Sequence, residues 1–155
     1  MNTSFEFFLM LLPFFSVSFI GYLYPISMTQ IRPVFQPPNW VFSLVWTYIL
    51  ISLGVISVKI FKIKMSNKKF NILLFLYLSL IGLLNMWLII NHYKLYKNAF
   101  WTLILSTFIS IIYLLQLGIT SKNKFDPRLI WLLLPLPFWL VIASSLNAVI
   151  YDHYG

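Results

Sequence analysis

The sequence predicts an all-α integral membrane protein, a bundle of five transmembrane helices that forms a single domain over residues 1–155. Three observations predict this fold class. Of the 155 residues, 61% are hydrophobic and 9% are charged, whereas a soluble domain carries about 25% charged residues. The apolar residues gather in five runs, each close to the ~20 residues that a helix needs to cross a bilayer. The runs are continuous rather than alternating, which favours helices over the strands of a membrane barrel.

Short polar connections join the predicted spans. The spans cover residues 5–24, 40–58, 72–91, 99–120 and 129–151. The last four contain no Asp, Glu, Lys or Arg, and the first holds only Glu6. Because no Lys or Arg precedes the first run, we expect a retained span rather than a cleaved signal peptide. Pro13, Pro135 and Pro137 lie inside predicted spans and should kink their helices or mark a helix start.

A proline-rich segment precedes the second span. Pro33, Pro37 and Pro38 fix φ and remove backbone donors, so no helix is expected before Pro38. Trp40 and Phe42 follow at once and enter the apolar run. We expect this segment to form a rigid entrance that delivers aromatic side chains into the bundle.

The basic residues predict the orientation in the membrane. Residues 59–71 and 120–128 hold eight of the eleven Lys and Arg residues, and the opposite side holds Arg32, Lys94 and Lys97. Cytoplasmic loops carry the excess of Lys and Arg. We therefore expect the N-terminus on the cytoplasmic side, with the C-terminus and the proline-rich segment outside. The net charge of +8 is explained by these loops, so the expected partner is the lipid bilayer and not nucleic acid.

Catalytic and metal-binding constellations are missing from the sequence. There is no Cys, so disulfides, thiol catalysis and thiolate metal sites are excluded. The three acids, Glu6, Asp126 and Asp152, lie near the termini or in a connection, and His92 and His153 lie at predicted membrane edges. No acid–base pair falls within a span, and no phosphate-binding loop is present. We expect no catalytic residue, no metal and no required cofactor.

Two amides and three tryptophans lie deep in the predicted spans. Asn85 and Asn147 must be satisfied in lipid, either by bonds that fix helix packing or by facing a ligand. Trp46, Trp87 and Trp139 are either core packing or the lining of an apolar pocket. Together these side chains are suited to a flat hydrophobic ligand.

The second span resembles a known family of membrane proteins. Residues 37–42, Pro-Pro-Asn-Trp-Val-Phe, with Trp46 and Gly54 behind them, are similar to the second-helix entrance of the TspO/translocator proteins. These are also called tryptophan-rich sensory proteins or peripheral-type benzodiazepine receptors. The Arg-Pro pair at 32–33 looks like the Lys-Pro pair of that family.

A second block strengthens the resemblance. The residues that keep the spacing of the family's fifth helix are Pro135, Trp139, Ala143, Leu146 and Asn147. Asn85 and Trp87 resemble the third-helix Asn and Trp, although their separation differs from the usual one. The resemblance covers nearly the whole chain, from Gly21 to Tyr151.

The resemblance implies a five-helix bundle, commonly dimeric, that binds tetrapyrroles such as protoporphyrin IX and haem as ligands. Some members bind cholesterol or synthetic ligands such as isoquinoline carboxamides. Carried over by position, the pocket residues are Phe42, Ser43, Trp46, Asn85, Trp87, Trp139, Ala143, Leu146 and Asn147. The residues expected at the pocket mouth are Arg32, Pro37, Pro38 and Trp40.

Three departures from the family pattern change these expectations. The first loop is short, and Ile26-Ser27 stands near the place of the family's Trp-Tyr pair, which implies a weaker lid. Thr102 lies near the place of the acid that usually opens helix four. No Lys or Arg follows the C-terminal tyrosines, so the cholesterol-type pattern is incomplete.

The leading hypothesis is a membrane-embedded binding and sensing protein for a porphyrin or haem. Trp46 and Trp139 would contact the ring, and Arg32 would pair with a propionate. One alternative is light-dependent porphyrin degradation, because Trp46 and Trp139 match residues implicated in that activity in the family. The other is a transporter or scaffold for hydrophobic metabolites or sterols.

Overall fold

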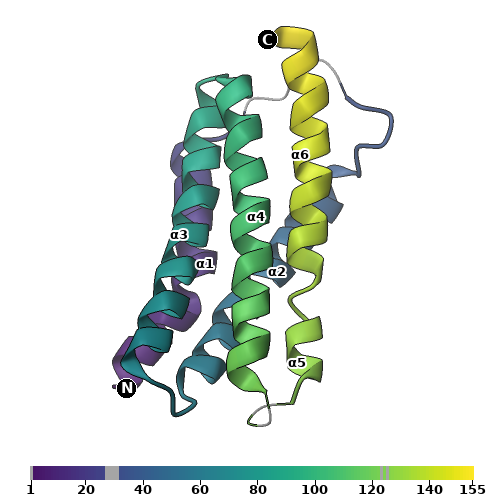
Figure 1. Ribbon diagram of the computed structural model, residues 1–155. Coiled ribbons are helices and arrows are strands. Elements are labelled where there is room, and N and C mark those ends of the chain that lie inside the picture. Colours follow the sequence, from purple (N-terminus) through teal and green to yellow (C-terminus); the bar gives the residue numbers. More distant parts are fainter. Residues whose placement is uncertain (1, 27–31, 123, 125) are drawn as a thin grey trace.

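The computed structural model describes residues 2–26, 32–122, 124 and 126–155. The helices are α1 (Thr3–Leu23), α2 (Asn39–Phe61), α3 (Asn67–His92), α4 (Tyr96–Ser121), α5 (Arg128–Trp131) and α6 (Pro135–Tyr154), shown in Figure 1. Five segments are long and apolar enough to cross a membrane, with α5 and α6 forming the fifth together. The predicted all-α five-span bundle is confirmed.

The helices pack side by side in a bundle. α1 packs against α2 and α3, α3 packs against α4, and α4 packs against α6. Aromatic side chains connect α2 to α6, since the Phe42 and Trp139 rings meet edge-to-face with centroids 5.1 Å apart. The two ends of the chain lie at opposite ends of the bundle (Figure 1), as an odd number of spans requires.

The long helices extend past the apolar runs that predicted them, most clearly α2, α3 and α4. α3 begins at Asn67 rather than at residue 72, and α4 begins at Tyr96 rather than at residue 99. Ser66 caps α3, with its hydroxyl oxygen accepting from the Lys69 N–H at 3.4 Å. α2 likewise continues to Phe61. Helix length here follows the backbone hydrogen bonds and caps, which continue into polar sequence beyond the lipid-facing residues.

Pro13 neither starts nor ends a helix, because α1 runs through it. A proline at this position cannot donate to the carbonyl four residues earlier, which belongs to Leu9. The Tyr77 hydroxyl donates to that Leu9 oxygen instead. Both residues are buried, so a side chain of α3 satisfies the backbone group that the proline leaves open in α1.

The predicted fifth span is broken into two helices. The sequence predicts that Pro135 either kinks a helix or marks a helix start, and α6 begins at Pro135. Residues 132–134 form a turn between α5 and α6. The turn is made by bonds between residues three apart, including Leu136 N–H to the Leu133 oxygen at 3.0 Å. The Leu132 oxygen accepts from the Tyr48 hydroxyl of α2 at 3.1 Å.

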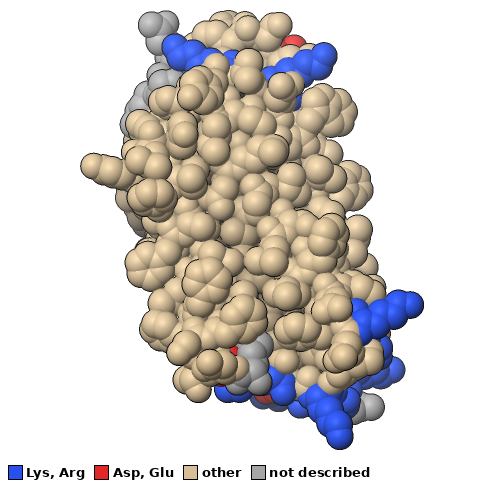
Figure 2. Space-filling model, turned by 90° about the vertical axis from the view of Figure 1, so that its left-hand side faces the viewer, with Lys and Arg blue, Asp and Glu red and all other residues tan. Residues whose placement is uncertain are grey.

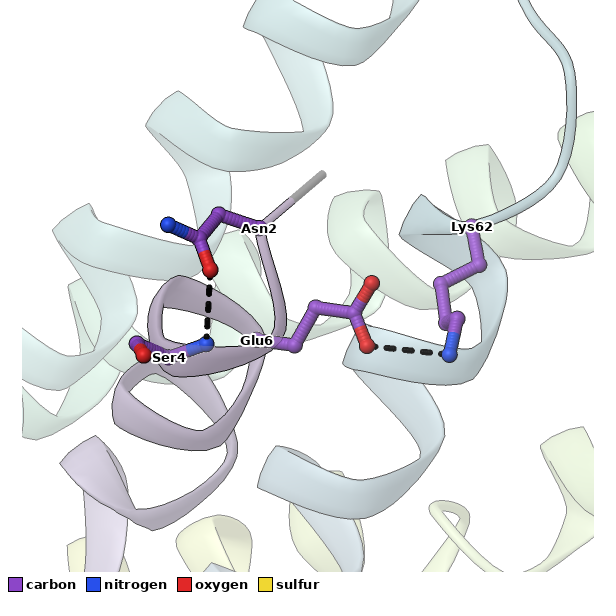
Figure 3. A network of polar contacts seen from close by, with 4 residues as sticks. All are labelled: Asn2, Ser4, Glu6 and Lys62. Atoms are coloured by element: carbon purple, nitrogen blue, oxygen red, sulfur yellow. Dashed lines mark hydrogen bonds and ion pairs between the residues drawn. The ribbon is translucent and has the colours of Figure 1, made fainter.

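Charged side chains lie at the two ends of the bundle and leave an uncharged band between them (Figure 2). At the N-terminal end, Lys62 Nζ of α2 lies 2.9 Å from Glu6 Oε2 of α1, as Figure 3 shows. The Asn2 side chain accepts from the Ser4 N–H at 3.1 Å and so caps α1. The ion pair ties the first turn of α1 to Lys62, the C-cap residue of α2.

Candidate functional site

A cavity of about 510 Å³ opens between α1, α2, α3 and α6, beside the segment that leads into α2. Its volume falls in the range of roughly 300–1,000 Å³ that is common for small-molecule sites. Each of the four helices contributes side chains at intervals of three or four residues, which is the spacing of one helix face.

α2 supplies the longest wall of the cavity. Its lining residues are Asn39, Phe42, Ser43, Trp46, Thr47 and Leu50. Pro38 is the N-cap residue of α2, so the proline-rich segment ends where prediction placed the helix start. Because the helix begins there, the aromatic residues of its first two turns take up a fixed helical phase toward the cavity.

The α3 wall carries a tryptophan that contacts both neighbouring walls. Trp87 stacks on Trp46 of α2, with centroids 6.0 Å apart and planes 26° apart. Its indole N–H donates to Asn147 Oδ1 of α6 at a long 3.5 Å. The Asn147 amide in turn donates to the Ala143 oxygen at 3.0 Å. These contacts orient the Trp87 ring and satisfy most of the Asn147 amide.

Polar groups gather at the mouth of the cavity. Arg32, Gln36 and Asn39 line it there, next to Ile26. Arg32 is the only charged side chain among the described residues of the lining. Ser27, the other residue near the missing aromatic pair of the first loop, lies outside the described residues.

Seven of the predicted site residues line this cavity. They are Arg32, Phe42, Ser43, Trp46, Trp87, Leu146 and Asn147. Pro37, Pro38 and Trp40 belong to the entrance segment and the start of α2 but not to the lining, and Trp40 is 69% exposed. The remaining three predicted residues, Asn85, Trp139 and Ala143, do not line the cavity.

Asn85 faces α1 instead of the cavity, because it precedes Trp87 by two residues. Two residues turn a helix by about 200°, so these two side chains cannot face the same way. Asn85 Nδ2 donates to Ser16 Oγ of α1 at 3.1 Å. Its Oδ1 atom is buried and has no hydrogen-bond partner among the described residues. The contact with Ser16 is of the kind that holds helices together in lipid.

Trp139 and Ala143 lie on the same face of α6 as Asn147 but are not part of the lining. Trp139 is 6% exposed and packs edge-to-face on Phe42, a residue that does line the cavity. Its indole N–H is buried without a partner in the described part of the chain. In this structure Trp139 lies behind Phe42, so it supports the cavity wall through that ring contact, and its predicted contact with a ligand stays a prediction.

Sequence reasoning missed Asn91 and the α1 wall. Asn91 lines the cavity, is 6% exposed, and its side-chain amide has no hydrogen-bond partner among the described residues. The available signal was its position four residues after Trp87, which places both on one face of a helix. The α1 wall, with Phe14, Val17, Ser18 and Gly21, follows the same spacing, and Ser18 is its one polar side chain among the described lining residues.

The cavity wall is suited to non-covalent contacts with a ligand. Aromatic and aliphatic side chains form most of the wall, and amide and hydroxyl groups add hydrogen bonds. The described lining residues include no Asp, Glu or His, so the wall as described offers no general acid or base of these types. A search of the described residues also finds no group of three or more His, Asp or Glu that could hold a metal ion.

Comparison with known proteins agrees with this arrangement. The family model for the TspO/MBR family matches residues 9–152, which is nearly the whole chain. No curated protein was found to match the chain. The family match and the five apolar spans indicate a multi-pass integral membrane protein with a sensing or binding role. With its five spans and the cavity between them, the chain belongs to the TspO/MBR family.

Proposed function

We propose that this protein binds a flat hydrophobic ligand of the porphyrin or haem type within the membrane and acts as a sensor of that ligand. The observation that carries the proposal is the aromatic wall formed by Phe42, Trp46 and Trp87. The Trp46 and Trp87 rings lie nearly parallel, and stacked indoles offer a flat apolar surface to a flat ligand. The porphyrin or haem is a ligand in this proposal and not a required cofactor.

The distribution of polar groups supports an amphipathic ligand. The apolar wall lies between the helices, whereas Arg32 and Gln36 line the mouth. A porphyrin has an apolar ring and carboxylates along one edge. A ring placed against Trp46 and Trp87 would turn its carboxylates toward the mouth that Arg32 lines, and a contact between guanidinium and carboxylate is a charge-assisted hydrogen bond.

Titration of the purified protein with protoporphyrin IX, followed by tryptophan quenching, tests the proposal. Trp46→Ala is expected to weaken binding by at least about ten-fold, because a large aromatic contact contributes on the order of 1.5–3 kcal/mol. Trp101→Ala is the matched control, since Trp101 is 58% exposed on α4 and does not line the cavity. Unchanged affinity of Trp46→Ala would show that the ligand does not bind in this cavity.

Light-dependent porphyrin degradation is a second candidate, favoured by the same stack of indoles. Trp46 and Trp87 would lie beside the bound ring, and indoles are readily oxidised. With no Asp, Glu or His in the described lining, conversion would rely on light and dioxygen rather than on acid–base chemistry. Mass spectrometry of illuminated and dark samples separates binding from turnover. Identical products with and without protein would remove this candidate.

A further inference from the structure

A second cavity, of about 470 Å³, lies at the N-terminal end of the bundle. None of its lining residues belongs to the ligand cavity. Its lining residues are Lys64, Met65, Ser66, Lys69, Thr120 and Lys124. They come from the connection between α2 and α3, the first turn of α3, and the end of α4 and the residues after it. Lys124 Nζ donates to the Lys64 oxygen at 3.1 Å and holds the two connections together.

Three of the six residues that line this cavity are lysines, whose ammonium groups carry positive charge and have no acceptor capacity. The Ser66 oxygen already accepts from the Lys69 N–H, which leaves its hydroxyl hydrogen to donate outward. The Thr120 hydroxyl makes no hydrogen bond within the described part of the chain. Three ammonium groups beside two hydroxyl groups that can each donate a hydrogen bond suit an anion such as a phosphate.

The carboxylates at this end of the bundle are engaged elsewhere. Glu6 pairs with Lys62 at 2.9 Å, and Asp126 accepts from the Arg128 N–H at 2.9 Å. Neither carboxylate lines the cavity. The described lining therefore holds three lysines and no carboxylate to neutralise them. The positive charges repel one another, and a bound anion would reduce that repulsion.

The position of the cavity indicates where the anion comes from. It lies at the end of the uncharged band, where basic side chains gather (Figure 2), and this is the level at which lipid headgroups meet a spanning helix. Met65 adds an apolar contact beside the lysines. We propose that this cavity binds the phosphate headgroup of an anionic phospholipid, and that this site is separate from the porphyrin cavity.

Native mass spectrometry of the protein in mixed micelles of phosphatidylglycerol and phosphatidylcholine tests the site. The unaltered protein should retain phosphatidylglycerol in preference. The combined change of Lys64, Lys69 and Lys124 to Gln should weaken that retention by at least ten-fold, since each Lys near an anionic surface contributes about a five-fold factor. Lys69→Gln alone should lose about five-fold, which keeps the test open if the triple variant fails to fold.

The matched control changes Lys59, Lys68 and Lys122 to Gln, which removes the same charge from the same end without touching the lining. Because these lysines also lie near the anionic surface, this variant should lose some retention, but clearly less than the triple variant of the lining. Equal losses in the two triple variants would overturn the site in favour of a general surface potential. Displacement of the lipid by millimolar inorganic phosphate would overturn the lipid as the ligand and indicate a soluble anion. Retained protoporphyrin quenching in the triple variant would show that the two cavities act independently.

Discussion

Asn91 lines the cavity from α3, is 6% exposed, and its side chain makes no hydrogen bond within the described part of the chain. Its amide is not among the side-chain atoms that are fully buried without a partner, so it reaches the cavity, where a hydrogen bond from a ligand would contribute about 0.5–1.5 kcal/mol. Asn91→Ala should therefore weaken protoporphyrin IX binding by about three- to ten-fold without lowering the stability of the empty protein. Asn71→Ala, an exposed amide on the same helix, should leave the tryptophan-quenching titration unchanged. Equal affinity for the two variants would mean that Asn91 does not contact the ligand.

Gly54 is required by the close approach of α1 and α2. A Cβ atom at this position would lie 1.9 Å from the Met10 carbonyl oxygen, and a backbone atom cannot move aside as a flexible side chain can. Gly54→Ala should lower the free energy of unfolding by about 1–3 kcal/mol. A denaturant titration of the protein in detergent micelles measures this change. Gly82→Ala is the control, because a Cβ there meets nothing within 4 Å. That control should raise stability by up to about 1 kcal/mol through helix propensity, and a loss in both variants would refute the packing argument.

At the scale of elements, the break between α5 and α6 depends on a contact from another helix. The Leu132 oxygen has no partner within the turn and accepts from the Tyr48 hydroxyl. Tyr48→Phe should lower stability by about 0.6–1.5 kcal/mol, the range for one hydrogen bond within a membrane bundle. Tyr22→Phe is a suitable control, since Tyr22 is 83% exposed. If both variants unfold at the same denaturant concentration, water or lipid satisfies the Leu132 oxygen instead.

The two proline-interrupted spans show how far local sequence predicts an element. Pro135 predicted a helix start and one is present, because a proline at the first position loses no hydrogen bond. Pro13 allows two outcomes by itself. Which outcome occurs depends on Tyr77, a residue of α3 whose hydroxyl satisfies the Leu9 carbonyl, so the continuity of α1 was not readable from α1 alone.

At the scale of the whole molecule, the charge distribution predicts one orientation in the membrane. Eight of the eleven Lys and Arg residues lie at the N-terminal end, so this end should face the cytoplasm. The chain has no Cys, which allows single reporters. A Cys at Tyr154 should react with an impermeant thiol reagent in intact cells, whereas a Cys at Lys68 should react only after permeabilisation. The reverse pattern would show that the orientation is inverted.

The sequence by itself determined the number of spans, the helical class, the start of α2 after Pro38 and the aromatic residues of the α2 wall. These features depend on local composition and on spacing within one helix, which a linear sequence records directly. Tertiary structure decided which side chains meet across helices. Asn85 and Trp87 differ by about 200° in helical phase, and only the placement of α1 beside α3 shows that Asn85 binds Ser16 while Trp87 faces the cavity. In the same way, Trp139 lies on the face of α6 that the sequence predicts, but it packs on Phe42 and is not part of the cavity lining. Only the tertiary structure shows this, because the boundary of the cavity depends on how several helices pack together.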